Sequence, residues 1–288
     1  MKKILVIANM GWSIERVHRD VESALSEHYE FKFYHDSGFY LDEVMREFHA
    51  SDLCLITMNI QDGVISLFNL HKPADLRKLV VVAHGFGEIL KSGNWSPDIT
   101  YGTVSDILLP FFPLYAHVVP NGVDLSLFQR KPHSGQITTL GWCGALHIRA
   151  KLSDRAFEIA RKARLPVSIA ETLSLDALKI WYHSIDVLLV TSGPHPYDET
   201  GPLPPFEAIA CGTIAIGTNV GNFRKVPGPK FSTTDEAALI LADLKADPER
   251  AKNLAEEQYA WVKQNWTYQT HAAQWKSMFD AAVEKRCV

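Results

Sequence analysis

The sequence predicts an α/β protein built on parallel sheets. Short apolar runs alternate with stretches whose apolar residues recur at helical spacing, a pattern typical of βαβ units. The alternation breaks at 112–121, within the Pro-rich stretch FFPLYAHVVPN. A chain of 288 residues can form one large or two medium domains. We therefore place the domain boundary at this break.

Four apolar runs predict strands in the first half of the chain, at 4–8, 31–34, 53–57 and 79–83. A helix is predicted between the first two, where Ile14, Val17, Val21 and Leu25 fall on one helical face. A second helix is expected around 41–48.

The second half repeats the pattern. Strands are predicted at 137–142, 167–170, 187–191 and 213–217. Helices are predicted at about 152–164, 174–183, 203–211, 234–245 and 248–264, followed by a last helix at 267–285.

Composition narrows the class of protein. The 47% hydrophobic and 22% charged residues are those of an ordinary globular chain. The start MKKILVIANM fits a first core strand and not a signal peptide, and no apolar stretch approaches the roughly 20 residues of a membrane span. The four cysteines (Cys54, Cys143, Cys211, Cys287) show no paired spacing, which favours a reducing compartment. We expect a cytoplasmic protein without stable membrane insertion.

Two carboxylates and a helix start come together in residues 186–221, DVLLVTSGPHPYDETGPLPPFEAIACGTIAIGTNVG. Glu199 lies in a Gly/Pro-rich loop after a buried strand, and Glu207, seven intervening residues later, lies in the first turn of a helix opening near Leu203. Open α/β sheets bind ligands beyond the carboxyl ends of their strands. Carboxylates suit hydroxyl groups, and the amides of Gly201 and Leu203 at a helix N-terminus suit phosphate, so the segment predicts a nucleotide-sugar site.

This segment resembles the Glu-x7-Glu region of retaining glycosyltransferases of the GT-B fold, in the family usually called GT4 (glycosyl transferases group 1). Residues 118–124, VVPNGVD, with Phe128 after them, are similar to the interdomain element IPNGVD...F of that family. Residues 141–146, GWCGAL, with Lys151, are similar to its GxxGRLxxxxKG strand and loop. The resemblance covers about 118–225 well and the first 117 residues in outline.

The resemblance implies two Rossmann-like domains facing each other across a crevice. Residues 1–117 would form the N-terminal acceptor domain and residues 118–266 the donor domain that binds the nucleotide sugar. Residues 267–288 would cross back to the first domain as a C-terminal helix.

The same resemblance assigns roles to residues of the second half. Glu207 would bind the ribose hydroxyls of the nucleotide, and Glu199 would contact the donor sugar. Lys151 would neutralise the diphosphate, although a lysine at the start of an exposed helix also fits simple solvation. The family carries an arginine where this chain has Ala145, and Arg149 is the candidate to replace it.

One departure from the family affects the phosphate loop. The common pattern after the first Glu is Gly-Phe-Gly, whereas this chain has Thr200, Gly201 and Pro202. Prolines at 202, 204 and 205 donate no N–H, so fewer amides are available to a ligand.

Two residues of the first half complete the predicted site. His84, after the apolar run LVVVA, would lie close to the transferred sugar, with a structural histidine as the alternative. Gly11, in the first strand-to-helix loop, resembles the glycine that lets the backbone approach the phosphate, with a plain turn as the alternative.

The sequence predicts neither a metal site nor a bound cofactor. No Asp-x-Asp pair is present to bridge a divalent ion, and the histidines show no metal-ligand spacing with one another or with a cysteine. A nucleic-acid acceptor is disfavoured, because residues 1–116 carry ten Lys or Arg against fifteen Asp or Glu.

The sequence thus indicates an enzyme that moves a hexose from a nucleoside-diphosphate sugar, taken as a UDP-sugar, to an acceptor hydroxyl with retention of configuration. The expected acceptor is a surface glycan or another small, soluble molecule, ahead of a modified DNA base. Two alternatives stay open: a GT-B sugar-nucleotide epimerase, and a non-catalytic sugar-nucleotide-binding protein.

Overall fold

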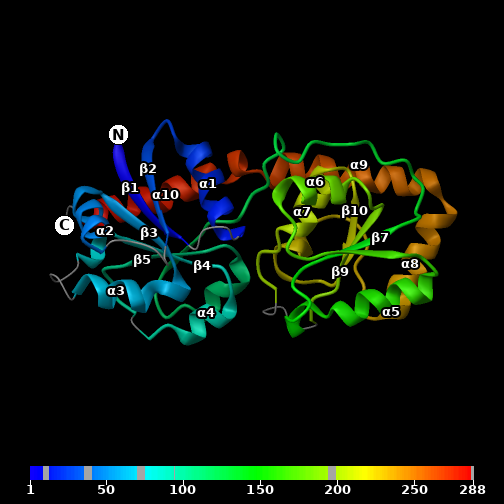
Figure 1. Ribbon diagram of the computed structural model, residues 1–288, viewed down its shortest axis with the longest axis horizontal. Helices are drawn as coiled ribbons and strands as arrows, with labels where there is room; N and C mark the ends of the chain where they lie inside the picture. Colours follow the sequence, from blue (N-terminus) through cyan, green and yellow to red (C-terminus); the bar gives the residue numbers. More distant parts are fainter. Residues whose placement is uncertain (9–12, 36–40, 70–74, 94, 194–198, 287–288) are drawn as a thin grey trace. The chain divides into compact units, whose positions relative to one another are not determined.

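The computed structural model describes residues 1–288 except 9–12, 36–40, 70–74, 94, 194–198 and 287–288. The chain divides into two compact units (Figure 1). Unit 1 comprises Met1–Gly122 together with Tyr268–Val288, and unit 2 comprises Val123–Thr267.

Unit 1 is built on a six-stranded parallel sheet of order β2-β1-β3-β4-β5-β6. Its central strands are buried on both faces, which explains why they appear in the sequence as continuous apolar runs. The strands are β1 (Lys2–Ala8), β2 (Tyr29–His35), β3 (Leu53–Thr57), β4 (Leu79–Ala83), β5 (Thr100–Thr103) and β6 (Ala116–Val118).

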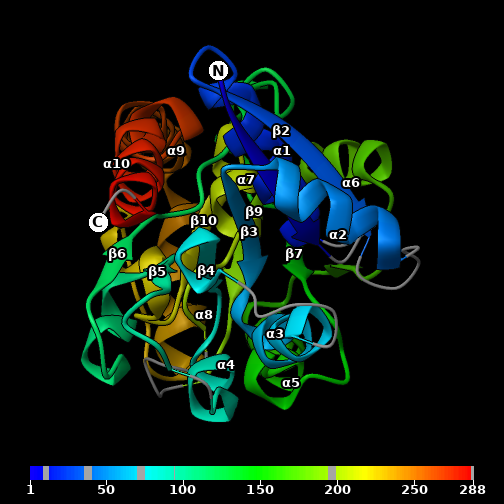
Figure 2. The same ribbon diagram turned by 90° about the vertical axis from the view of Figure 1, so that its left-hand side faces the viewer.

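Helices cover both faces of this sheet (Figure 2). Those of unit 1 are α1 (Ser13–Leu25), α2 (Leu41–Ala50), α3 (Gln61–Asn69), α4 (Phe86–Lys91) and α10 (Tyr268–Arg286). One core joins α2, α3 and α4 to the sheet, while α1 and α10 pack against each other, and α10 also contacts strands β3 to β6.

Helix α10 confirms the expectation that the chain crosses back to its first half. The Trp275 indole donates to the Pro120 carbonyl at 3.1 Å, and the Tyr29 hydroxyl donates to Asp280 at 2.6 Å. Near its end, Arg286 donates to the Asp52 carbonyl at 2.6 Å. These bonds fix the helix along its length on unit 1.

Unit 2 contains a four-stranded parallel sheet of order β10-β9-β7-β8. Its strands are β7 (Leu140–Cys143), β8 (Val167–Ala170), β9 (Val187–Val190) and β10 (Ile214–Gly217). Its helices are α5 (Ser153–Ala163), α6 (Leu175–Tyr182), α7 (Pro204–Ala210), α8 (Thr234–Ala246) and α9 (Pro248–Asn265). Along β9, Val187 and Leu189 enter one core while Leu188 and Val190 enter the other, so the sheet is covered on both faces.

The structure departs from the predicted elements at β7 and in elements that were not predicted, among them helices α3 and α4. The strand predicted at 137–142 begins only at Leu140, because the Asp186 carboxylate takes the N–H groups of Thr138 and Thr139 at 2.7 and 2.9 Å. Strands β5 and β6 were not predicted, and β6 lies inside the stretch taken as a break. Both are short, and β5 contains Gly102, whose added Cβ would lie 2.6 Å from Met278 Sδ on α10.

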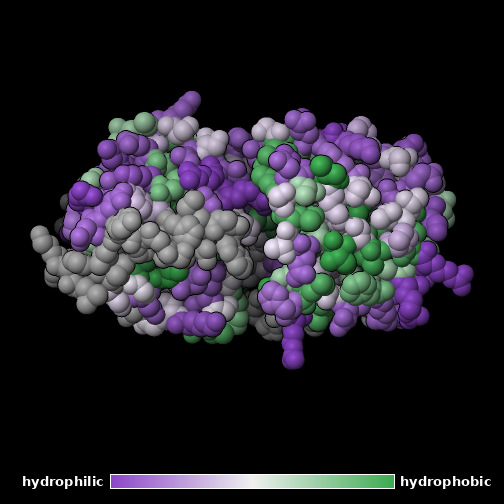
Figure 3. Space-filling view, in the orientation of Figure 1, coloured by the Kyte–Doolittle hydropathy of each residue, from purple (hydrophilic) through white to green (hydrophobic). Residues whose placement is uncertain are grey.

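The surface carries no continuous apolar band in the view of Figure 3, where the green patches over unit 2 are small and separate. Exposed large apolar side chains include Phe157, Ile180 and Leu239. Such scattered exposure is ordinary in globular proteins. Among the described helices, none has the length and apolar character needed to cross a membrane.

Candidate functional site

An ion pair between Lys151 and Glu199 marks the centre of the site in unit 2. Lys151 ends the short 3-10 helix Arg149–Lys151 that follows β7, and Glu199 comes from the loop after β9. The Lys151 ammonium donates to the Glu199 carboxylate, which also accepts from the Ser192 hydroxyl at 3.3 Å. Their side chains are 25% and 12% exposed, so the pair is largely shielded from water yet reachable from it.

The backbone of Lys151 is fixed by groups at the end of β9. The Trp142 indole donates to the Thr191 hydroxyl at 2.8 Å, and that hydroxyl donates to the Lys151 carbonyl at 2.8 Å. The Gly193 N–H donates to the Ala150 carbonyl at 2.9 Å. The loops after two neighbouring strands are therefore tied together where parallel sheets bind ligands.

Gly221 determines how the Glu199 loop lies. Its φ is +44°, and an added Cβ would lie 2.4 Å from the carbonyl oxygens of both Glu199 and Thr200. The next residue, Asn222, donates its N–H to the Thr200 carbonyl at 2.9 Å. Only glycine permits this close approach, so Gly221 is required for the position of Glu199.

Glu207 lies on α7 as a buried carboxylate, 4% exposed. The Tyr182 hydroxyl at the end of α6 donates to it at 2.8 Å. The Glu207 charge and burial together raise the pKa of nearby Cys211 to about 12, with burial the larger cause. Because burying a polar group is costly unless it is hydrogen-bonded, the Tyr182 bond offsets part of the cost of burying the Glu207 side chain.

A small cavity of about 20 Å³ beside the Lys151–Glu199 pair has room for one water molecule. Lys151, Glu199 and the prolines at the start of α7 are among the residues that line it. The N–H groups of Gly201 and Leu203 precede α7 and have no protein acceptor among the described residues. Cationic, anionic and amide groups thus lie at one end of the sheet.

Arg149 does not join the ion pair. Its side chain is exposed and contacts no carboxylate in the described part of the chain. It precedes Lys151 by two residues in the same 3-10 helix, and its exposed side chain is available to a ligand. The structure brings together Lys151 and Glu199, and leaves Arg149 in solvent.

His84 belongs to unit 1 and follows β4 directly. Its backbone N–H donates to Glu88 Oε2 at 2.9 Å, and its ring lies 6.0 Å from the ring of His18. Burial lowers the pKa of His84 to about 4 and raises the pKa of Glu88 to about 7. His84 is therefore a neutral imidazole at pH 7, able to donate one hydrogen bond and accept another. Gly11 lies outside the described residues.

Sequence reasoning missed four supporting residues, which are Tyr182, Thr191, Ser192 and Gly221. Each acts through a contact with a residue distant in sequence, so no local motif marks it. The one local signal was the pair Thr191 and Ser192 directly after β9, because polar residues beyond the carboxyl end of a buried strand often face a ligand. The described residues contain no group of three or more His, Cys, Asp or Glu arranged to hold a metal ion.

Comparison with known proteins finds a family match within unit 2. Residues 143–261 match the family model described as glycosyl transferases group 1. This segment contains Lys151, Glu199 and Glu207. No curated protein matches the chain.

Several solved structures share the fold at low sequence identity. Anabaena Alr3699/HepE, solved with UDP and glucose, is 15% identical with a TM-score of 0.74, over 98% of this chain and 100% of that one. The catalytic domain of starch synthase IV from Arabidopsis thaliana, solved with ADP and acarbose, is 11% identical with a TM-score of 0.69, over 99% of each chain. AviGT4, a glycosyltransferase of avilamycin A biosynthesis, is 15% identical with a TM-score of 0.63, over 99% of this chain and 98% of that one.

Two Rossmann-like units with parallel sheets, and a C-terminal helix that returns to the first unit, give this chain the GT-B fold, and its second unit carries the match to group 1 glycosyl transferases.

Proposed function

We propose that this protein is a glycosyltransferase that moves a hexose from a nucleoside-diphosphate sugar to an acceptor hydroxyl with retention of configuration. The observation that carries the proposal is the Lys151–Glu199 pair on the wall of the cavity, with Glu207 in the same segment that matches group 1 glycosyl transferases. UDP is the first choice of nucleotide, since Anabaena HepE was solved with UDP.

In this proposal Lys151 stabilises the departing diphosphate. Without donor its ammonium is neutralised by Glu199, and with donor it turns to the phosphate oxygens. The free amides of Gly201 and Leu203 add hydrogen bonds, and Arg149 adds a second positive charge. These positively charged and N–H groups stabilise the negative charge that develops on the leaving diphosphate. Such preorganised stabilisation lowers the activation barrier of the transfer.

The two carboxylates divide the remaining work. Glu207 accepts hydrogen bonds from the ribose diol while Tyr182 holds one of its oxygens. Glu199, once released by Lys151, accepts from hydroxyls of the donor sugar. His84, neutral at pH 7, contacts the sugar from unit 1. No protein nucleophile is invoked; the diphosphate takes the acceptor proton on the face from which it departs.

Two measurements on the intact chain test the proposal. At least one of the UDP-, GDP- and ADP-hexoses, with UDP-hexose as first choice, should raise the melting temperature, because a ligand that binds only the folded state stabilises it. The stabilising donor should also release its nucleoside diphosphate slowly without any acceptor. Binding without release would favour the non-catalytic binding protein, and conversion of the sugar nucleotide into an isomer would favour the epimerase.

A further inference from the structure

A second pocket lies in unit 1, at the end of the sheet opposite to His84. It is formed where β5 and β6 begin and where α10 ends, with a volume of about 390 Å³. That size falls in the range of about 300–1,000 Å³ typical of small-molecule sites. His84 follows the carboxyl end of β4, whereas this pocket lies at the amino ends of its parallel neighbours. The pocket is therefore separate from the site described above.

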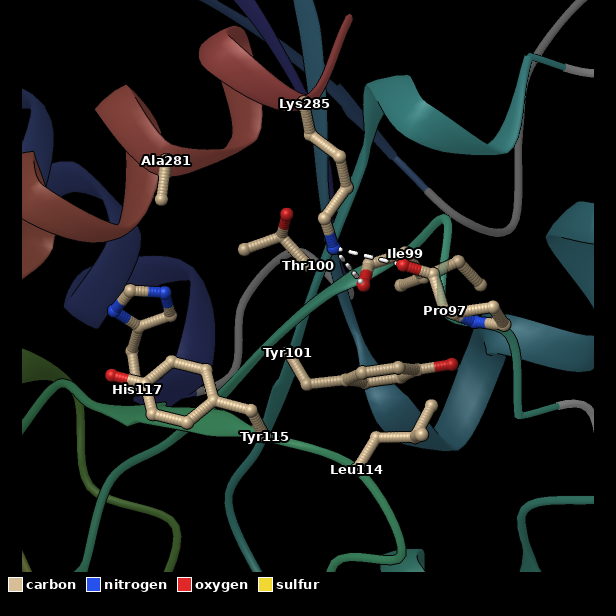
Figure 4. Close-up of a pocket in the computed structure, with 9 residues that line it drawn as sticks. All are labelled: Pro97, Ile99, Thr100, Tyr101, Leu114, Tyr115, His117, Ala281 and Lys285. Carbon is tan, nitrogen blue, oxygen red and sulfur yellow. Dashed lines mark hydrogen bonds between the residues drawn. The ribbon is translucent and has the colours of Figure 1, made fainter. Parts of the chain in front are cut away.

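Figure 4 shows rings and one ammonium group around this pocket. Tyr115 is 78% exposed, and its ring meets that of His117 edge to face, with centroids 4.9 Å apart. Leu114, Ile99 and Ala281 add apolar surface. The exposed ring of Tyr115 thus offers a flat apolar face beside a concave wall.

Lys285 supplies the charge. Its ammonium donates to the carbonyls of Pro97 and Ile99 at 3.0 and 2.9 Å (Figure 4). An ammonium has three N–H donors, so one remains for a ligand. No carboxylate lines the pocket in the described part of the chain. An anion that entered the pocket would meet the positive charge of Lys285, which bonds to no carboxylate among the described residues.

Two neutral groups complete the lining. His117 has no hydrogen bond to its ring from the described residues, and burial, followed by the charge of Lys285, lowers its pKa. It is therefore a neutral imidazole, which suits a hydroxyl group. Thr100 is 4% exposed, and its hydroxyl has no partner among the described residues. Buried groups of this kind are normally satisfied by a ligand or an ordered water.

We propose that this pocket binds an acidic pyranose, such as a uronic acid residue of a glycan, with its ring against Tyr115 and its carboxylate on Lys285. The choice of a sugar over another cyclic acid rests on the proposed function. The expected position of the ring follows from exposed Tyr115, and the expected negative charge of the ligand follows from Lys285. Bound there, an acidic glycan would be held on unit 1 at the end of the sheet opposite to His84.

The test uses the intact chain with methyl glucuronide and, for comparison, methyl glucoside, followed by saturation-transfer NMR and titration. The glucuronide should bind measurably more tightly than the glucoside. Tyr115→Ala should weaken glucuronide binding at least severalfold, and Phe157→Ala, which removes an exposed ring from unit 2, should leave it unchanged. Lys285→Met keeps the apolar stem and should abolish the preference for the acidic sugar, with melting temperature checked because Lys285 bonds two carbonyls.

Equal binding of the two glycosides by the natural protein, or unchanged glucuronide binding in Tyr115→Ala, would overturn the proposal. Release of nucleoside diphosphate from the donor sugar nucleotide is measured on the same protein preparations. Glucuronide binding without nucleotide release would contradict the proposed function and support the pocket proposal. Nucleotide release without glucuronide binding would support the proposed function and contradict the pocket proposal.

Discussion

The hydroxyl of Tyr182 donates to the carboxylate of Glu207 at 2.8 Å, and both side chains are almost fully buried. The bond joins the end of α6 to α7 and holds one carboxylate oxygen. Phe206, the residue before Glu207, stacks on Trp266 with ring centroids 4.7 Å apart. The Tyr182 bond holds the Glu207 carboxylate and the ring stacking holds the neighbouring residue of α7 before any ligand arrives, which lowers the ordering cost of binding.

Tyr182→Phe should weaken nucleotide binding by less than removal of Glu207 does. The substitution keeps the buried ring and removes one hydrogen bond to a charged group, which contributes about 1.5–3 kcal/mol to stability. A lower melting temperature with a modest loss of nucleotide affinity is expected, measured by calorimetric titration. Full loss of binding in a folded Tyr182→Phe protein would show that Tyr182 itself contacts the ligand.

Lys151→Met should weaken binding of the nucleoside diphosphate and reduce its release from the donor. The variant keeps the apolar stem and removes the cation, so the diphosphate charge is met only by Arg149 and backbone amides. Lys245→Met, at an exposed position of α8, is the matched control and should behave as the natural protein does. Identical affinities of Lys151→Met and Lys245→Met for the nucleoside diphosphate would show that Lys151 does not contact it.

Nucleotide release should survive chelation. If Lys151, Arg149 and the amides neutralise the diphosphate, EDTA should leave the rate unchanged and added magnesium or manganese should not raise it. The assay is donor turnover in chelated buffer, with the cation returned in a second sample. A rate lost in EDTA and restored by the cation would refute the metal-independent mechanism.

His18 should make the protein less stable in acid. It is fully buried, lies against His84 and Trp275, and neither ring nitrogen has a partner among the described residues. Burial, followed by the charge of His84, lowers the pKa of His18 from 6.5 to about 3. Between these values the unfolded chain binds a proton that the folded chain does not, so this contribution to stability falls as pH falls.

His18→Leu should remove this dependence. From pH 6.5 to pH 5 the variant should lose about 2 kcal/mol less free energy of unfolding than the natural protein does, measured by urea titration. His28→Leu, at an exposed histidine, should follow the natural curve. Parallel curves for His18→Leu and the natural protein would contradict the assignment.

Local sequence patterns predicted the helices and strands whose signals lie within their own residues. The buried runs of β3 and β4 and the helical spacing of Val17, Val21 and Leu25 in α1 are examples, since both signals lie within the element. Strand β5 was missed because its Gly102 is explained only by the approach of α10 from the other end of the chain. β7 was predicted too long because Asp186, distant in sequence, binds the backbone of Thr138 and Thr139.

In the candidate site too, the sequence predicted the residues that lie in local motifs and missed those that act through contacts between distant segments. Glu199, Glu207 and Lys151 lie in motifs that a resemblance can find, and the structure places Lys151 and Glu199 in direct contact. Tyr182, Thr191 and Gly221 orient them through contacts between different elements. Such contacts depend on the register of neighbouring strands, which no single segment encodes.

The most direct measurement is a calorimetric titration of the intact natural protein and of Glu207→Ala with UDP, GDP and ADP. At least one nucleotide should bind the natural protein. Glu207→Ala should bind it more weakly by roughly 1–3 kcal/mol, or about 5- to 150-fold, because a charged hydrogen-bond acceptor for the ribose is lost. Equal affinities in two folded proteins, or no binding of any of the three nucleotides, would contradict a donor site centred on Glu207.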